Sequence, residues 1–340
     1  MKKLSFIDTL IYICNSIAAG LLLFTYCIPF ISPKSIATVS VLSLGLPPLL
    51  FANILFVLYW ILKLKKQFLI SLIVIAIGFQ HVQAFFQWSE KKSMRNDDYK
   101  ILSYNVRLFN IFKWTDREDL PNKIYKFIGE KDPDILCLQE YHRKAKKIDN
   151  YPYQYIKHNN GSIGQAILSK HKIIDKGSLN FQKTGNNAVF ADIILKKDTI
   201  RVYNIHMQSL KMEIEKDNFG SKDAESLLSK LKKHFRTQAT QVEQILAHQA
   251  KSPYKTMIVG DFNNTAFSWL YHQLKKGKKD AFIEAGSNFG KSFDYIFPLR
   301  IDFILVDTSM HINNFKTYSV QYSDHYPIMA RFNMSPNLVK

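Results

Sequence analysis

Three long stretches without any charged residue occupy most of the first ninety positions of this 340-residue chain. They cover residues 9–33, 35–62 and 67–89, and none of them contains Asp, Glu, Lys or Arg. A helix needs about 20 largely apolar residues to cross the hydrocarbon core of a bilayer. Runs of this length also occur as buried helices of soluble domains, but three in succession favour membrane spans. We therefore interpret residues 1–89 as a membrane-anchor region with about three transmembrane helices.

The three stretches differ in how well they suit a spanning helix. Pro47 and Pro48 interrupt the second stretch, so its spanning helix is expected to begin near them. The third stretch is apolar over residues 68–79 and then carries Gln80 and His81 among aromatic residues. Its later part could lie at the interface or pack on its neighbours. A cleaved signal peptide is the poorer interpretation, because the first apolar run is too long and two more follow.

Basic residues around the spans set the expected orientation. With three spans, one side would carry five basic residues, namely Lys2, Lys3, Lys63, Lys65 and Lys66. The other side would carry four, namely Lys34, Lys91, Lys92 and Arg95. The positive-inside preference then favours a cytoplasmic N-terminus and an extracytoplasmic C-terminal domain. If the third segment does not cross, that domain is cytoplasmic instead.

Charge and cysteine content limit the partners of the chain. The net charge is +18, of which about +12 belongs to residues 98–340. A basic surface attracts nucleic acid and anionic membranes, but scattered lysines also serve solubility, so charge alone does not establish nucleic-acid binding. Cys14 and Cys27 lie in the first apolar run, and Cys137 is alone in an apolar strand. The sequence therefore offers neither a disulfide framework nor a thiolate metal site.

The remaining chain has the pattern of a single α/β domain. Residues 90–98 are polar and form a predicted linker to a domain at 99–340. Amphipathic helices are expected from Pro121 onward and over residues 225–250, between groups of strand-like runs. We expect residues 210–224 to be irregular and to be the specificity loop. Two packed sheets covered by helices would account for this order of elements.

Six short apolar runs of this domain hold polar residues that a buried strand would not otherwise contain. They are residues 101–106, 133–140, 202–207, 257–263, 300–306 and 323–327. Carboxylates, amides and imidazoles are costly to bury unless they are paired or bound to an ion. Their repeated placement at strand ends predicts one shared cleft to which several strands deliver their tips.

The residue types in these runs point to phosphoester chemistry. The carboxylates of Glu140, Asp261 and Asp324 are hard oxygen ligands, and without a Cys cluster they favour Mg²⁺, or Mn²⁺, over structural zinc. Any one of these acids would ordinarily be a strand-end cap or an ion-pair partner. The candidate set also includes two amides and two imidazoles, from Asn105, Asn263, His206 and His325. Such a set can orient water and hold phosphate oxygens.

Asp302 has a different predicted environment. It alternates with apolar Ile301 and Phe303, which indicates a buried position that needs a partner. A neighbouring histidine such as His325 would provide one and would be supported in its positive form.

The order of these motifs resembles the endonuclease/exonuclease/phosphatase superfamily, which includes DNase I-like and exonuclease III-like nucleases, sphingomyelinases and inositol-polyphosphate phosphatases. The resemblance covers nearly all of residues 98–340 and depends most on Gly260-Asp-Phe-Asn263 and Ser323-Asp-His325. It implies a DNase I-like four-layer sandwich of two packed β-sheets flanked by helices. The preceding spans resemble those of bacterial membrane-anchored members, which implies an integral protein of the bacterial inner membrane.

The resemblance also implies a role for each motif residue. The metal ligands would be Glu140, Asn105 and Asp324. Asp261 would position or activate the attacking water, and Asp302 would orient His325. The scissile phosphate would be contacted by His206, Asn263 and His325. Together these imply a Mg²⁺-dependent hydrolase.

The expected function is that of a membrane-anchored phosphodiester hydrolase whose most favoured substrate is nucleic acid. A phospholipid, phosphoinositide or sphingomyelin phosphodiesterase is the enzymatic alternative, and a catalytically silent membrane-bound binding module is the non-enzymatic one. The lipid bilayer is an expected partner through the N-terminal helices, and the sequence points to no obligate protein partner. Since Asp261 is expected to face solvent, Asp261→Ala should abolish hydrolysis with little loss of folding.

Overall fold

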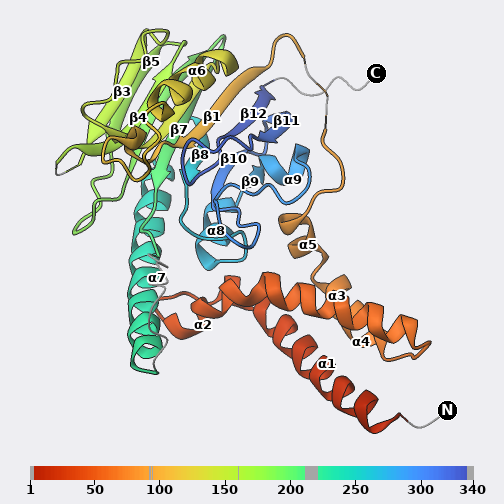
Figure 1. Ribbon diagram of the computed structural model, residues 1–340. Helices are drawn as coiled ribbons and strands as arrows, with labels where there is room; N and C mark the ends of the chain where they lie inside the picture. Colours follow the sequence, from red (N-terminus) through yellow and green to blue (C-terminus); the bar gives the residue numbers. More distant parts are fainter. Residues whose placement is uncertain (1–3, 92, 94, 160, 211–220, 335–340) are drawn as a thin grey trace. The chain divides into compact units, whose positions relative to one another are not determined.

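The computed structural model describes residues 4–91, 93, 95–159, 161–210 and 221–334 (Figure 1). The chain divides into two compact units. The first contains the chain up to Phe85, the described part of Glu213–Ala239, and Thr265–His272. The second contains Phe86–Met212, Thr240–Asn264 and Gln273–Lys340. The expected specificity loop at 210–224 lies largely outside the described residues, and where the chain is described again at Ser221 it is helical.

The N-terminal unit begins with two long apolar helical segments. One is α1 (Phe6–Thr25) with η1 (Ile28–Phe30), and the other joins α2 (Ala37–Val41), η2 (Leu42–Gly45) and α3 (Leu46–Leu62). Within the described residues both segments are long and apolar enough to cross a membrane. Pro47 and Pro48 lie in the first turn of α3, where a missing N–H leaves no helical hydrogen bond unmade.

The third apolar stretch is broken rather than continuous. Helices α4 (Phe68–Ile77) and α5 (Phe79–Phe85) are bent by 74° at Gly78. A break of this size fits either one interrupted span or a re-entrant loop. The described residues thus contain two candidate spans, or three if the bent pair crosses as one.

A buried polar network joins the helices of this unit. Ser71 Oγ accepts a hydrogen bond from Asn15 Nδ2 and donates one to Asn53 Oδ1, both at 2.7 Å. Trp60 Nε1 donates to Asn15 Oδ1 at 2.8 Å. All four side chains are fully buried. Because each polar group finds a partner on another helix, the network fixes how α1, α3 and α4 pack together.

The second unit is built on two six-stranded mixed sheets. The first has the order β11-β12-β1-β2-β4-β3 and the second the order β5-β6-β7-β8-β10-β9. The strands of the first sheet are β1 (Tyr99–Asn105), β2 (Ile135–His142), β3 (Tyr153–His158), β4 (Ile163–Ser169), β11 (His311–Thr317) and β12 (Ile328–Asn333). Those of the second are β5 (Ile173–Ser178), β6 (Asn187–Leu195), β7 (Asp198–His206), β8 (Lys255–Asp261), β9 (Lys278–Asp280) and β10 (Asp302–Asp307).

The sheets pack face to face over an apolar core. Ile101 and Ile135 of the first sheet belong to one buried cluster with Val202, Val259 and Ile304 of the second. The opposite face of the first sheet is covered by α6 (Leu120–Lys131), which buries Ile124, Phe127 and Ile128. Helix α9 (Ala281–Ala285) also belongs to this unit, whereas α7 (Ser221–Gln249) and α8 (Trp269–Lys275) each have residues in both units. This architecture confirms the predicted DNase I-like sandwich of two packed sheets flanked by helices.

Part of the predicted linker is bonded to the second unit. Gln87 and Asn288 exchange two backbone hydrogen bonds of 2.8 and 2.7 Å. Asn314 Nδ2 donates to Glu90 Oε1 at 2.7 Å, and Lys91 Nζ donates to the carbonyl of Ile312 at 2.9 Å. The segment that follows α5 is therefore held against α9 and β11.

Candidate active site

The topology of the two sheets brings the predicted polar strand ends together. Strands β7 and β8 are parallel, and their last residues, His206 and Asp261, are direct neighbours. Strand β10 runs antiparallel to β8, so its first residue, Asp302, lies opposite Asp261. Asn105 ends β1, which pairs in parallel with β2, and Glu140 lies near the end of β2. The two sheets thus gather these side chains in one cluster, which is open to solvent at Glu140 and which we call the cleft.

Asp261 occupies the centre of the site. Gly260, the residue before it in β8, has φ +134°, and a Cβ there would lie 2.1 Å from the carbonyl oxygen of Ile205. The close approach of β7 and β8 therefore requires glycine. Asn263, in the left-handed conformation with φ 49°, donates its backbone N–H to Asp261 Oδ1 at 2.8 Å and its Nδ2 to Oδ2 at 3.2 Å.

Asp261 is not solvent-facing, and that expectation was wrong. Its side chain is 1% exposed, because His206, His325, Asn105 and Asn263 surround it. Burial raises the pKa of Asp261 to about 6, although the two imidazoles oppose this effect. An alanine here would leave these polar partners unpaired in a buried place, so loss of folding would accompany loss of activity.

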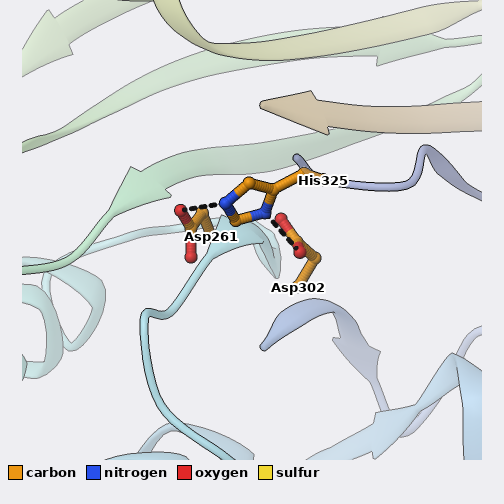
Figure 2. Close-up of side chains that lie close together, drawn as sticks. All are labelled: Asp261, Asp302 and His325. Carbon is orange, nitrogen blue, oxygen red and sulfur yellow. Dashed lines mark hydrogen bonds and ion pairs between the residues drawn. The ribbon is translucent and has the colours of Figure 1, made fainter. Parts of the chain in front are cut away.

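His325 lies between two carboxylates, as Figure 2 shows. Its Nδ1 is 2.9 Å from Asp302 Oδ2, and its Nε2 is 3.6 Å from Asp261 Oδ2. Burial by itself would lower the pKa of His325, but Asp302 and Asp261 outweigh it and raise the pKa to about 10. The ring is therefore an imidazolium at neutral pH. Its Nδ1–H is bonded to Asp302, whereas its Nε2 lies 3.6 Å from Asp261 Oδ2, beyond hydrogen-bonding distance. The expected pairing of Asp302 with His325 is present.

Asn105, Glu140 and His206 form the other side of the cleft. Asn105 Nδ2 donates to Asp261 Oδ2 at 3.0 Å and contacts Glu140 Oε1 at 3.4 Å. His206 Nε2 lies 3.6 Å from Asp261 Oδ2 and 3.9 Å from Glu140 Oε1. Burial raises the pKa of Glu140 and lowers that of His206, so His206 is neutral at physiological pH. Glu140 has φ 52°, a conformation that costs backbone strain, and it lies within a break in the pairing of β2 with β4 between Leu138 and Tyr141.

Asp324 joins the cleft through its neighbours. Ser323 Oγ donates to the carbonyl of Asn105 at 2.8 Å, which ties this segment to the end of β1. Asp324 Oδ2 forms a 3.1 Å ion pair with Arg107, and its charge contributes to the raised pKa of Glu140. The structure therefore gathers all eight residues that the sequence nominated, in one unit and around one cleft.

Arg107 is a site residue that the sequence reasoning left aside. Its guanidinium lies 4.4 Å from the ring centroid of Trp114 and pairs with Asp324. It begins a run of four residues with positive φ, Arg107 to Asn110, which L-amino acids adopt at a cost. The side chain of Asn110 holds this turn through hydrogen bonds to the carbonyls of Thr115 and Arg117, each 3.0 Å. The only signal in the sequence was the closeness of Arg107 to Asn105.

Ser292 and Phe293 are further supports that the sequence did not indicate. Ser292 Oγ accepts from the backbone N–H groups of Ile301 at 3.0 Å and Asp302 at 2.9 Å, which fixes the start of β10. The ring of Phe293 packs edge-on against His325, with centroids 5.0 Å apart. By contrast, Arg300 is bound to Asp280 at 2.8 Å in a buried ion pair, which is a structural role.

The donor set fits a hard divalent cation beside Glu140. Glu140 and Asp261 are carboxylates whose pKa values are both raised, chiefly by burial, so a bound cation would stabilise their charged forms. The side chains of Glu140 and Asp324 remain 28% and 27% exposed, which leaves their oxygens accessible. Asp261, Asp302 and His325 also have possible ligand atoms within 4.8 Å of one another. In that trio the imidazolium already supplies the positive charge, so the Glu140 side suits a cation better.

Comparison with known proteins agrees with this geometry. A family model described as the Endonuclease/Exonuclease/phosphatase family matches residues 102–325, and one described as a domain of unknown function matches residues 8–85. No curated protein matches the chain in sequence.

Solved structures share the fold of the second unit. Humanized D. rerio TDP2 has a TM-score of 0.54 and 16% identity, covering 70% of this chain and 100% of its own. The human Nocturnin catalytic domain has a TM-score of 0.54 and 16% identity, covering 71% and 95%. An endonuclease/exonuclease/phosphatase from Bacteroides vulgatus has a TM-score of 0.53 and 17% identity, covering 70% and 99%.

Proposed function

The chain belongs to the endonuclease/exonuclease/phosphatase family of phosphoester hydrolases, and on that premise we propose that it is a membrane-anchored, divalent-cation-dependent phosphodiesterase acting on nucleic acid. The observation that carries the proposal is the buried imidazolium of His325, held by Asp302 and Asp261 beside the partly exposed Glu140. This arrangement places a fixed positive charge, a carboxylate of near-neutral pKa and oxygen ligands around a single cleft.

The chain's own residues divide the chemistry between them. Asp261, whose pKa is about 6, is ionised at neutral pH and accepts the proton of an attacking water or orients it. The imidazolium of His325 binds a phosphate oxygen and stabilises the charge that grows on it in the transition state. Asn263 and neutral His206 supply further donors to the phosphate. Asp302 keeps the His325 ring in place and protonated.

The cation would be held by Glu140, Asn105 and Asp324. Mg²⁺, or Mn²⁺, prefers carboxylate and amide oxygens of this kind. When bound, it neutralises phosphate charge and stabilises the leaving oxygen. Asp324 Oδ2 pairs with Arg107 at 3.1 Å, and Asp324 Oδ1 lies within hydrogen-bonding distance of Ser323 Oγ, at 3.1 Å.

Nucleic acid is the substrate class with most support. Residues 98–340 carry a charge of about +12, which attracts polyanions. A structure of D. rerio TDP2 in complex with a single-strand DNA product has a TM-score of 0.53 to this chain at 15% identity. A phospholipid, phosphoinositide or sphingomyelin substrate is the second candidate, because an anchored site is near headgroups. A silent binding module has little need for a paired Asp302 and His325.

We place the anchor at residues 1–89, a short linker at 90–98 and the catalytic domain at 99–340. The two apolar helical segments support membrane association. The resemblance to bacterial membrane-anchored members favours the bacterial inner membrane. With three spans, the balance of basic residues favours the extracytoplasmic side for the catalytic domain.

Hydrolysis by the full-length protein in detergent tests the proposal. The panel contains single- and double-stranded DNA, RNA, phosphoinositides and sphingomyelin, each with Mg²⁺ and with EDTA. The matched variants are His325→Gln, which removes the imidazolium, and His311→Gln, which changes a histidine of β11 outside the cleft. Mg²⁺-dependent cleavage of nucleic acid that only His325→Gln abolishes supports the proposal. Cleavage restricted to lipids replaces its substrate class, and no cleavage by a folded protein overturns it.

A further inference from the structure

An exposed apolar loop projects from the second unit next to the cleft. Ile296 and Phe297 are 91% and 52% exposed, and they lie at the tip of a loop whose ends pair at Phe293 and Leu299. Trp88, which is 84% exposed, lies on the neighbouring segment after α5. Large apolar side chains with this exposure are uncommon as a group on monomeric soluble proteins and mark a contact surface.

The two segments are physically joined. Gln87 and Asn288 exchange two backbone hydrogen bonds, and the rings of Phe86 and Phe289 are 5.0 Å apart. Phe86 in turn contacts Trp88, also at 5.0 Å between centroids. Trp88 and the loop at 289–297 therefore belong to one continuous part of the unit, which we call the apolar rim and define as residues 86–88 and 289–297.

The base of the rim is bound to the catalytic residues. Ser292 Oγ accepts from the N–H of Asp302, and the Ser292 carbonyl accepts from Tyr326 N at 2.7 Å. Asp294 N donates to the carbonyl of Asp324 at 2.8 Å, and Phe293 packs on His325. A contact made by the tip of the apolar rim would therefore also restrain the segments that carry Asp302, Asp324 and His325.

The chemistry of the rim suits the surface of a bilayer. Indole and phenyl rings with a nearby lysine, here Lys291, are typical of the membrane interface. Only Phe86 and Gln87 separate Trp88 from the end of α5, the last helix of the apolar region. Nucleic-acid bases could stack on Trp88 and Phe297 but not on Ile296, the most exposed residue of the loop, and the closeness of Trp88 to the end of α5 in the sequence favours lipid.

We propose that the apolar rim inserts into the headgroup layer of the membrane that anchors the chain and seats the catalytic cleft against that surface. The proposal depends on the membrane anchoring in the proposed function. Because Ser292, Phe293 and Asp294 bind the catalytic segments directly, the inserted rim holds the cleft at the bilayer surface without changing the substrate class of the proposed function.

Spin-label accessibility in the full-length protein tests the contact. Cys14 and Cys27 are replaced by alanine, and buried Cys137 is kept because a nitroxide reagent cannot reach it. Single cysteines are then introduced by Trp88→Cys and Phe297→Cys. The matched control is Ile174→Cys, an exposed apolar position on the edge strand β5, at the other end of the second sheet from β9 and β10. Each labelled protein is placed in lipid nanodiscs and exposed to oxygen and to a water-soluble nickel chelate.

We expect oxygen to relax the labels at 88 and 297 more than the nickel chelate does, with the reverse order at 174. If 88 and 297 behave like 174, the proposal is overturned. Flotation of the same samples with lipid separates this failure from a failure of anchoring, because an unanchored protein does not float. Hydrolysis of a soluble phosphodiester by each labelled protein reports that the cleft is intact.

Discussion

Replacing Asp302 by asparagine should convert His325 from a permanent imidazolium into a group that titrates near neutrality. The pKa of His325 is about 10, whereas an ordinary histidine titrates near 6.5. The difference corresponds to about 5 kcal/mol of preference for the charged ring, at about 1.36 kcal/mol for each pH unit. Asp302 is the largest favourable contribution, at 2.9 Å from Nδ1, and burial acts against it. Asp302→Asn keeps the shape and removes the charge.

The expected size of the effect follows from the protonated fraction. If the pKa of His325 falls to about 6.5, only about one tenth of the rings carry a proton at pH 7.5. The rate should then fall at least about tenfold from protonation alone, and lowering the pH by about one unit should recover several-fold. The wild-type rate should instead show no rise over the same interval, because its ring is already charged.

Nitrogen-15 NMR of the imidazole groups measures the pKa directly. The protein is labelled at histidine and studied in EDTA, and His325→Gln assigns the resonance. The control is Asp294→Asn, whose carboxylate accepts from Tyr326 and does not bind His325. The reasoning is refuted if His325 of Asp302→Asn still titrates above about pH 9, or if Asp294→Asn lowers its pKa equally.

Three further substitutions test the supporting structure. Asn110→Ala removes the hydrogen bonds that hold the left-handed turn. It should lower the free energy of unfolding measured in urea by about 2–3 kcal/mol and reduce activity. An unchanged midpoint of urea unfolding would show that the turn does not need these bonds. Gly260→Ala places a Cβ 2.1 Å from the Ile205 carbonyl and should prevent a folded, active product, as judged by proteolysis, whereas Gly129→Ala, with open space around it, should be tolerated. Burial lowers the pKa of Lys278 in the folded protein from 10.5 to about 8. Between these two values the unfolded chain binds the proton more readily than the folded protein does. The contribution of Lys278 to the free energy of unfolding therefore rises with pH across this interval. Relative to Lys278→Met, the wild type should therefore gain about 2 kcal/mol between about pH 7.5 and 9.5, and a constant difference would contradict the lowered pKa.

The strand ends of the site were predictable because each combines an apolar run, typical of a buried strand, with a polar residue that burial disfavours. Asn105, His206 and Asp261 each end an apolar run of a buried strand, where polar groups need a reason to be present. The ends of these runs therefore predicted the residues of the site without any knowledge of the sheet order. The sandwich followed from the same runs, because strands of that length and apolar content must be covered on both faces.

Other features depend on contacts that no local pattern records. Strand β5 carries Asp175 and Lys176 and is half exposed, so it lacked the apolar signal of the central strands. The turn at Arg107 to Asn110 adopts positive φ without glycine, because Asn110 and buried Phe109 compensate the strain through distant partners. The burial of Asp261 arises from both histidines and both asparagines closing over it, and only the assembled cleft brings them there.

The polar network among Asn15, Asn53, Ser71 and Trp60 has a consequence for how the anchor can be exchanged. A simple tether requires only apolar length, and any hydrophobic helix could replace it. Here three helices recognise one another through amide, hydroxyl and indole groups that have no partner in lipid. A chimera in which an unrelated apolar helix replaces one of these helices would keep its apolar length but lose the hydrogen bonds that fix how α1, α3 and α4 pack. Under the proposed membrane anchoring, the N-terminal region is thus a small helical domain with its own packing specificity, and grafting experiments should move it as a whole.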